Sequence, residues 1–247
     1  LPPLVPEKYR LEVAERIDAQ GEILTPLTET EVERLAGAVE TLDVPAVAIT
    51  LQQCFTNDEH EARLGQRLQS VVPYVALSHK MSPEPREFER TNTTVLNAAL
   101  MPLTAGYLED LQQAAGNGTN LHLCHSAGGM ASIAAMQDRP LALALSGPAA
   151  GVAAAARIAR ELGLTQAIGF DMGGTTTDTC AVIDGKVQVD GNQRLAARPV
   201  RQLMVAVESI GAGGGSIARV QGQAIRVGPD SAGADPGPAC YGFGGDQ

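Results

Sequence analysis

The sequence is poor in aromatic side chains and contains no tryptophan. Aromatic residues make up 3% of the 247 residues, although 44% of the residues are apolar. A hydrophobic core must therefore be built from aliphatic and small side chains, and the 27 glycines allow backbone segments to approach one another closely. The length is sufficient for one large domain or two ordinary ones.

Cysteines are few, and long apolar runs are missing. The four cysteines never form a Cys-x-x-Cys pair, so neither a disulfide framework nor a zinc ribbon is indicated. No run of about 18 apolar residues occurs, and no charged-then-apolar signal opens the chain. We therefore expect no membrane partner and a reducing, cytoplasmic location.

Basic residues are outnumbered by acidic ones. With 18 Lys and Arg against 28 Asp and Glu, the formal net charge is −10. Phosphate-backbone recognition needs basic patches, so a nucleic-acid partner is not expected. A specific cationic partner is the alternative to an ordinary acidic surface, but nothing else in the sequence supports it.

Helical and strand-like patterns alternate along the first half of the chain. Thr28 and Glu31 form a capping-box signature, followed by apolar residues at helical spacing up to Leu42. The runs 44–51 and 74–78 are typical of buried strands, and a long helix is expected after Asn92. This alternation predicts an α/β domain with a largely parallel sheet.

The second half begins after Gly116-Asn117-Gly118, the clearest boundary in the sequence. An alanine-rich helix is expected from Ser146 to about Leu162. Apolar runs and an Asp184-Gly185 turn then predict a three-stranded antiparallel meander over residues 167–189.

One loop of this meander has the composition of a phosphate-binding site. A strand delivers Asp171 to the edge of the sheet, glycines free the backbone to turn its amide groups one way, and Asp178 begins the return strand. Carboxylates beside phosphate oxygens repel unless a divalent cation lies between them, so Mg²⁺ bound by Asp171 and Asp178 is implied. A plain glycine-rich hairpin is the alternative. The predicted phosphate contacts are Gly173, Gly174, Thr175, Thr176 and Thr177.

Two further glycine-rich segments follow. Gly211–Ser216 allows close approach of a phosphate or a flat ligand, although a flexible linker has the same composition. The run Gly228–Gly242 is studded with proline and suggests a rigid wall of a site. Its strongest candidates for chemistry are Asp235 and Cys240, whose roles stay open.

Taken together, five segments strongly resemble the hydantoinase A/5-oxoprolinase family, in the same order and over essentially the whole chain. This family includes N-methylhydantoinase, 5-oxoprolinase, and subunits of acetone and acetophenone carboxylases. The segments that carry the resemblance are Arg86–Ala98, Leu145–Gly151, Asp171–Asp178, Gly211–Ser216 and Gly228–Gly242.

The resemblance implies an actin-like ATPase fold, in which two ribonuclease-H-like lobes face each other across a nucleotide. Family members carry an earlier phosphate loop and continue further, so an internal, incomplete fragment is expected. Residues 1–26 would be a linker or edge segment, 27–115 the last part of the first lobe, and 116–247 the first part of the second.

By resemblance, the protein is an ATP-dependent hydrolase that opens a cyclic amide of the hydantoin or 5-oxoproline type. ATP would phosphorylate the substrate carbonyl, and Asp171 and Asp178 would act in catalysis and hold Mg²⁺. A hydantoinase B-type subunit is the implied partner, and the fragment alone is expected to be inactive. The residues expected to border the nucleoside are Gly213, Gly214, Gly215 and Ser216.

Departures from the family pattern leave the substrate open. Related sequences tend to read Asp-Ile-His-Thr-Val where this chain has Ala206-Val207-Glu208-Ser209-Ile210, so the Asp and the His are missing and the role of Glu208 is undetermined. An ATP-dependent carboxylase subunit and a non-catalytic nucleotide-binding module remain alternatives. His60 is expected to be solvated or locally bonded, and Arg86–Arg90 to be a salt-bridged helix start or part of a site.

Overall fold

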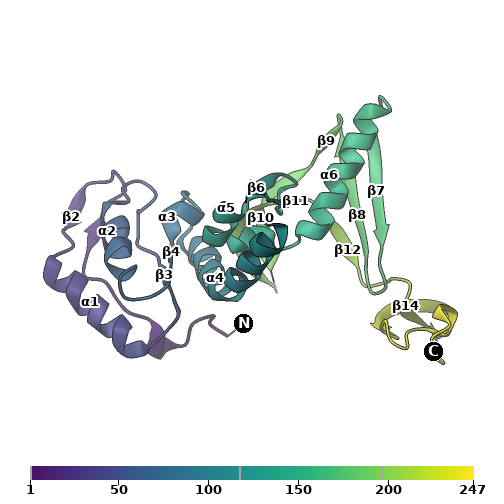
Figure 1. The fold of residues 1–247 in the computed structure, drawn as a ribbon, viewed down its shortest axis with the longest axis horizontal. Helices are drawn as coiled ribbons and strands as arrows, with labels where there is room; N and C mark the ends of the chain where they lie inside the picture. Colours follow the sequence, from purple (N-terminus) through teal and green to yellow (C-terminus); the bar gives the residue numbers. More distant parts are fainter. Residues whose placement is uncertain (1, 117, 196) are drawn as a thin grey trace. The chain divides into compact units, whose positions relative to one another are not determined.

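Residues 2–116, 118–195 and 197–247 are described in the computed structural model (Figure 1). Leu1, Asn117 of the expected boundary and Ala196 lie outside these residues. Packing divides the chain into two units. The first unit comprises the described parts of Leu1–His125, Met130–Ala144 and Asp190–Leu203, and the second comprises Ser126–Gly129, Leu145–Val189 and Met204–Gln247.

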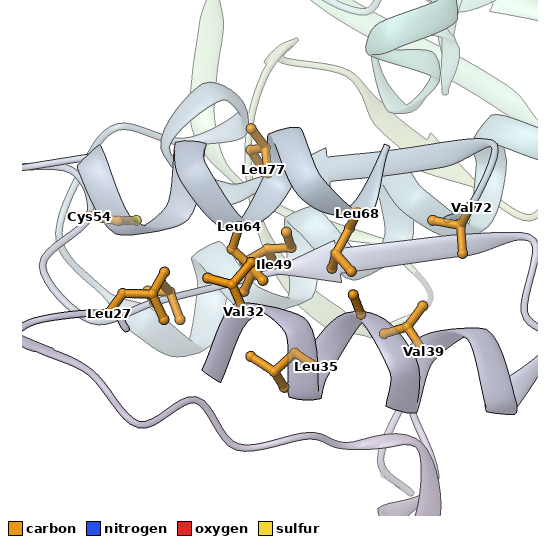
Figure 2. Close-up of a cluster of buried hydrophobic side chains, with 12 residues drawn as sticks. Leu27, Val32, Leu35, Val39, Ile49, Cys54, Leu64, Leu68, Val72 and Leu77 are labelled. Carbon is orange, nitrogen blue, oxygen red and sulfur yellow. The ribbon is translucent and has the colours of Figure 1, made fainter. Parts of the chain in front are cut away.

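The first unit is built on two parallel strands covered by helices on both faces. β3 (Ala46–Ile49) and β4 (Tyr74–Leu77) pair in parallel, and α2 (Glu59–Leu68) connects them. Figure 2 shows side chains of α1 (Glu29–Leu42) and α2 meeting around Ile49 of β3. On the other face, α4 (Glu87–Ala115) packs Ala98 and Met101 against the small side chains of both strands. The α/β class expected from the sequence is confirmed.

The helix starts in this unit follow local capping only in part. Thr28 caps α1 by accepting a hydrogen bond from the Glu31 amide, as the capping signature predicts. The long helix, however, begins at Glu87 rather than after Asn92, because the polar turn from Glu87 onward already continues into the helix. It runs through Pro102 to Ala115.

The remaining elements of the first unit are short. Among them, α3, α5 and η2 pack on α4, where Leu108 is fully buried beside Ile133 and Met136. β10 and β11 form a hairpin that falls mostly within this unit. These elements are η1 (Glu7–Tyr9), β1 (Arg16–Ile17), β2 (Ile23–Thr25), α3 (Ser78–Met81), β5 (His122–Cys124), β6 (Met130–Ser132), α5 (Ile133–Asp138), η2 (Pro140–Leu143), β10 (Val189–Leu195) and β11 (Arg198–Val205).

The second unit is an antiparallel sheet with one helix on it. The strand order is β12-β8-β7, with β9 also paired to β8, which confirms the predicted meander. α6 (Ser146–Glu161) lies along β7 and β8 (Figure 1), and its alanines fill the interface. The strands are β7 (Gln166–Met172), β8 (Thr177–Ile183), β9 (Lys186–Val187) and β12 (Glu208–Ile210), followed by the separate hairpin β13 (Ser216–Gln221) and β14 (Ala224–Ser231) and by η3 (Ala239–Tyr241).

The packing units and the lobes expected from the resemblance have different boundaries. Residues 130–144 belong to the first unit because α5 and η2 pack on α4. The lobe assignment itself stays a prediction. No helix within the described ranges combines the length and the apolar character needed to cross a membrane.

Candidate functional site

Two carboxylates lie opposite each other on neighbouring strands of the second unit. Asp171 on β7 is the register partner of Asp178 on β8, and Ser209 on β12 pairs with Asp178 from the other side. The Ser209 hydroxyl donates a hydrogen bond to Asp178 Oδ1. Directly opposite residues point to the same face of a sheet, so the three side chains form one row. Like charges placed in this way repel, and a divalent cation between them would remove the repulsion.

The row lies on the face of the sheet that carries α6, toward the N-terminal end of this helix. Side chains of β8 alternate between faces, so Asp178 shares a face with Cys180 and Val182. Cys180 packs against the cluster that contains Ala149 and Val152 of α6, whereas Val182 belongs to the cluster of the later Ala156 and Ala159.

The loop between β7 and β8 presents consecutive backbone donors. It is closed by a hydrogen bond of 2.9 Å from the Gly173 amide to the Thr176 carbonyl. The amides of Gly174, Thr175 and Thr176 donate no hydrogen bond to another residue in the described part of the chain, and all three residues are exposed. Successive free amides in a turn are a typical anion-binding arrangement.

The glycine motif Gly211–Ser216 lies directly against this loop. The Gly214 amide donates to the Gly173 carbonyl at 2.9 Å, and the Gly215 amide donates to the Gly174 carbonyl at 2.7 Å. The prediction that the two glycine motifs, separated along the chain, meet in one place is therefore confirmed.

Several groups predicted to contact a ligand instead bond within the protein. Thr177 is 1% exposed, and its hydroxyl donates to the Ala212 carbonyl at 2.5 Å. The Gly213 amide donates to Ser216 Oγ at 2.8 Å, and the Ser216 amide donates to the Gly213 carbonyl at 3.0 Å. The Thr177 hydroxyl is thus engaged within the protein, whereas the hydroxyls of the exposed Thr175 and Thr176 donate to no residue in the described part of the chain.

The proline-rich third segment also reaches the glycine motif. The Ala232 amide donates to the Gly215 carbonyl at 2.8 Å. The Tyr241 hydroxyl lies so close that a methyl group added to Gly214 would be 3.0 Å from it. Sequence reasoning missed both Tyr241 and Ser209, because only the pairing of distant strands and loops brings them to the site.

The other candidates of this unit have no comparable arrangement. Asp235 and Cys240 are exposed, and no hydrogen bond joins their side chains to another residue in the described ranges. Glu208 pairs with Thr179 in the register next to Asp178, so its side chain points to the opposite face from the carboxylate row. The roles of these three residues stay open.

A second polar cluster, which the sequence did not reveal, lies in the first unit after the ends of β3 and β4. Glu61 is fully buried and accepts hydrogen bonds from Ser78 Oγ at 2.7 Å and from the His79 amide at 2.8 Å. Burial, followed by the charge of Glu61, raises the pKa of the Cys54 thiol to about 11. Arg90 is 1% exposed and donates to the Leu51 carbonyl at 2.8 Å.

Two expectations about polar residues of the first unit are corrected. His60 is not solvated: it is 2% exposed, its Nδ1 lies 2.7 Å from Glu15, and its Nε2 accepts from the Leu27 amide. The turn Arg86–Arg90 is only partly a surface salt bridge, because Arg90 is buried beside the Phe55 ring. Through its bond to the Leu51 carbonyl, Arg90 ties α4 to the loop after β3.

A largely apolar cavity of about 1160 Å³ lies in the first unit. It is lined by residues from the N-terminal segment, α1, α2, β3, α4, β10 and β11. Three arginines are among them, but no carboxylate, histidine or cysteine. A cavity of this kind lacks groups that could bind Mg²⁺ or carry acid–base chemistry. The candidate site is therefore the glycine-loop region of the second unit.

The geometry thus places a loop with free backbone amides beside two opposed carboxylates. Comparison with known proteins agrees with the family resemblance. A family profile described as hydantoinase/oxoprolinase matches residues 90–247, and one described as its N-terminal region matches residues 1–72. The chain belongs to the hydantoinase/oxoprolinase family.

Relatives show similarity over nearly the whole chain. An uncharacterised protein of Methanocaldococcus jannaschii is 40% identical over 99% of this chain, which covers 39% of that protein. The caprolactamase subunit alpha of Pseudomonas jessenii is 34% identical over 98% of this chain and 36% of its own length. The chain thus spans little more than a third of these relatives.

Two solved structures share the fold. The crystal structure of ATP-dependent caprolactamase from Pseudomonas jessenii superposes with a TM-score of 0.85 at 34% identity, over 98% of this chain and 36% of that one. A nucleotide-free acetone carboxylase, from work on ATP-dependent acetone carboxylation, gives 0.74 at 30% identity, over 94% of this chain and 34% of that one.

Proposed function

We propose that the second unit supplies the phosphate- and magnesium-binding part of the nucleotide site of an ATP-dependent enzyme. The observation that carries this proposal is the set of free amides at Gly174, Thr175 and Thr176 beside the opposed carboxylates Asp171 and Asp178. The similar structures, an ATP-dependent caprolactamase and an enzyme of ATP-dependent acetone carboxylation, support ATP as the phosphate-bearing ligand.

The charge distribution supports a metal in this site. Segments 166–178 and 206–217 contain no lysine or arginine, so no basic side chain from these loops offsets the charge of a polyphosphate. The described residues contain no cluster of three or more His, Cys, Asp and Glu suited to a metal. Mg²⁺ fits a site with only the two carboxylates of Asp171 and Asp178, because it is commonly held by one or two carboxylates together with phosphate oxygens and water. Bound there, it would neutralise charge on the transferred phosphoryl group.

The reaction that we propose is the opening of a cyclic amide. ATP would supply the phosphoryl group that activates the substrate carbonyl oxygen, after which water opens the ring. Overall, one ATP and two waters convert a lactam to its amino acid, or a hydantoin to its N-carbamoyl amino acid, with ADP and phosphate. The loop amides of Gly174–Thr176 would hold the phosphates, and Asp171 and Asp178 would hold the metal. Catalysis of this kind relies on positioning and charge stabilisation.

A carboxylase subunit is the second candidate function. The similarity to the acetone carboxylase structure, over 94% of this chain, favours it directly. The same phosphate site would serve, with activation of bicarbonate or a ketone in place of an amide. Because related proteins are named as subunits, a hydantoinase B-type partner is part of either proposal.

Measuring ADP release by the complete gene product, alone and with the partner subunit, tests these functions. ADP release dependent on a lactam or hydantoin supports the hydrolase. Release dependent on a ketone together with bicarbonate supports the carboxylase. Binding of Mg-ATP without turnover under any condition would assign a non-catalytic nucleotide-binding role. Absence of Mg-ATP binding would contradict the nucleotide site itself.

A further inference from the structure

The sequence predicts that Gly213–Ser216 borders the nucleoside, but the contacts of this segment point to a different task. We infer that Gly213–Ser216 is a positioning segment that orients the peptide groups of the phosphate loop Gly173–Thr177 toward the bound anion. This inference rests on the proposed function, since it concerns how the same phosphate site is made.

The orientation follows from the planarity of the peptide bond. In a trans peptide the carbonyl and the amide of one unit point in opposite directions. The Gly173 carbonyl, which shares a peptide unit with the Gly174 amide, accepts from the Gly214 amide, and the Gly174 carbonyl, which shares a unit with the Thr175 amide, accepts from the Gly215 amide. The two loop amides are therefore turned away from the glycine motif and are left free for an anion.

The fit requires glycine at position 213. A Cβ atom added there would lie 2.6 Å from the Gly173 carbonyl oxygen and 2.8 Å from the Thr175 nitrogen. These are backbone atoms of the phosphate loop, so they cannot move aside as the end of a side chain can. By contrast, a Cβ atom at Gly211 would approach no atom closer than 3.6 Å, where Pro229 lies.

The segment is also fixed to its surroundings. Its own amides at Gly213 and Ser216 bond within the motif, and the buried Thr177 hydroxyl ties the adjoining Ala212 carbonyl to β8. With its four amides engaged, the motif has no backbone donor left for a ligand and contributes rigidity. Preorganised donors of this kind need no reordering when the ligand binds.

Calorimetry with Mg-ATP and with Mg-tripolyphosphate separates positioning from nucleoside contact. In the complete gene product, Gly213→Ala should weaken the binding of both ligands to the same extent, by about 10- to 100-fold. The reason is that two amides are misdirected and the hydrogen bond of each accounts for roughly 3- to 10-fold in affinity. Gly191→Ala, outside the glycine loops at a position where an added Cβ meets no atom within 4 Å, is the control and should change both affinities less than about twofold. A loss confined to Mg-ATP, or no loss, would overturn the inference.

A second measurement does not depend on ligand binding or on Gly213→Ala folding well. In wild-type protein, hydrogen exchange should be slow at the Gly214 and Gly215 amides and fast at Gly174 and Thr175. Ser216→Ala, which removes the acceptor of the Gly213 amide, should speed exchange at Gly214 and Gly215 and weaken Mg-tripolyphosphate binding. Fast exchange at Gly214 and Gly215 in the wild type overturns the inference. Slow exchange without polyphosphate binding instead rejects only the proposed function.

Discussion

Single residues in the carboxylate row have different environments. Asp178 is partly buried and accepts a hydrogen bond from Ser209, whereas Asp171 is exposed at the end of β7. A hydrogen-bonded carboxylate is held in one orientation, so Asp178 is the fixed member of the pair. Asp171 remains free to follow a metal ion or a ligand.

Replacing Asp171 with asparagine should therefore leave the fold intact and lower ATP turnover by about 100-fold or more, because the charge opposite the metal is lost. Steady-state ADP release by the complete gene product measures this effect. Asp184→Asn is the matched control, since Asp184 occupies the turn at the other end of the same sheet with a φ of 52°, a conformation that asparagine adopts readily. Equal turnover by the wild type and Asp171→Asn would remove Asp171 from the mechanism.

A different residue-level prediction concerns acid stability. Hydrogen bonds from Arg34, followed by one from the Ala14 amide, lower the pKa of Glu31 from 4.5 to about 2. A carboxyl group with a lowered pKa stabilises the fold above its ordinary pKa, and this contribution disappears as the pH falls toward the folded-state value.

Glu31→Gln should thus reduce the free energy of unfolding by about 1 kcal/mol at pH 6, and the difference from the wild type should shrink between pH 4.5 and 2. Urea denaturation across this range measures it. Glu40→Gln, an exposed position on the same helix, is the control. A difference that does not change with pH would contradict the assigned cause.

The sequence could identify site residues only where their partners are close along the chain. Asp171, Asp178 and the loop between them were recognisable because strand, turn and return strand are continuous. His60 and Arg90 were misjudged, because their partners Glu15 and Leu51 lie 45 and 39 positions away. A polar residue near a helix start gives no local sign that its tip is buried.

At the scale of elements, periodicity and capping predicted α1, α6 and the meander β7-β8-β9, since each is defined by its own side chains. The start of α4 was placed too late, at Asn92 instead of Glu87, because the polar first turn lacks an apolar stripe. The pairing of β12 with β8 was not predictable, as it joins residues about 30 positions apart without a tight turn.

Two helical glycines provide a matched test of element packing. A Cβ atom on Gly65 of α2 would lie 2.6 Å from the buried Leu77 side chain of β4, whereas one on Gly37 of α1 meets nothing within 4 Å. Gly65→Ala should destabilise the first unit by about 1–3 kcal/mol through overpacking. Gly37→Ala should stabilise it by about 0.5–1 kcal/mol through helix propensity. Chemical denaturation measures the free energy of unfolding of both variants. An equal change in the two would contradict the packing of α2 on β4.

At the scale of the whole molecule, the first unit contributes an α/β core with a buried polar cluster, and the second unit contains the candidate phosphate site. The chain spans little more than a third of its relatives, so the reaction of the complete enzyme is inferred from the site and the family together. The family was recognisable from the sequence because the glycine motifs are long and follow the same order as in the family. The α/β class was recognisable because helical and strand patterns alternate along the chain. The substrate was not, because the residues before Gly211 depart from the family pattern.

The central claim is that the loop amides bind nucleotide phosphate beside a carboxylate-bound metal. A crystal structure of the complete gene product with Mg²⁺ and a non-hydrolysable ATP analogue tests it most directly. Phosphate oxygens are expected within about 3.2 Å of the amide nitrogens of Gly174, Thr175 and Thr176, with Mg²⁺ between the phosphates and the Asp171–Asp178 pair. A nucleotide bound elsewhere, with these amides facing only water, would contradict the claim.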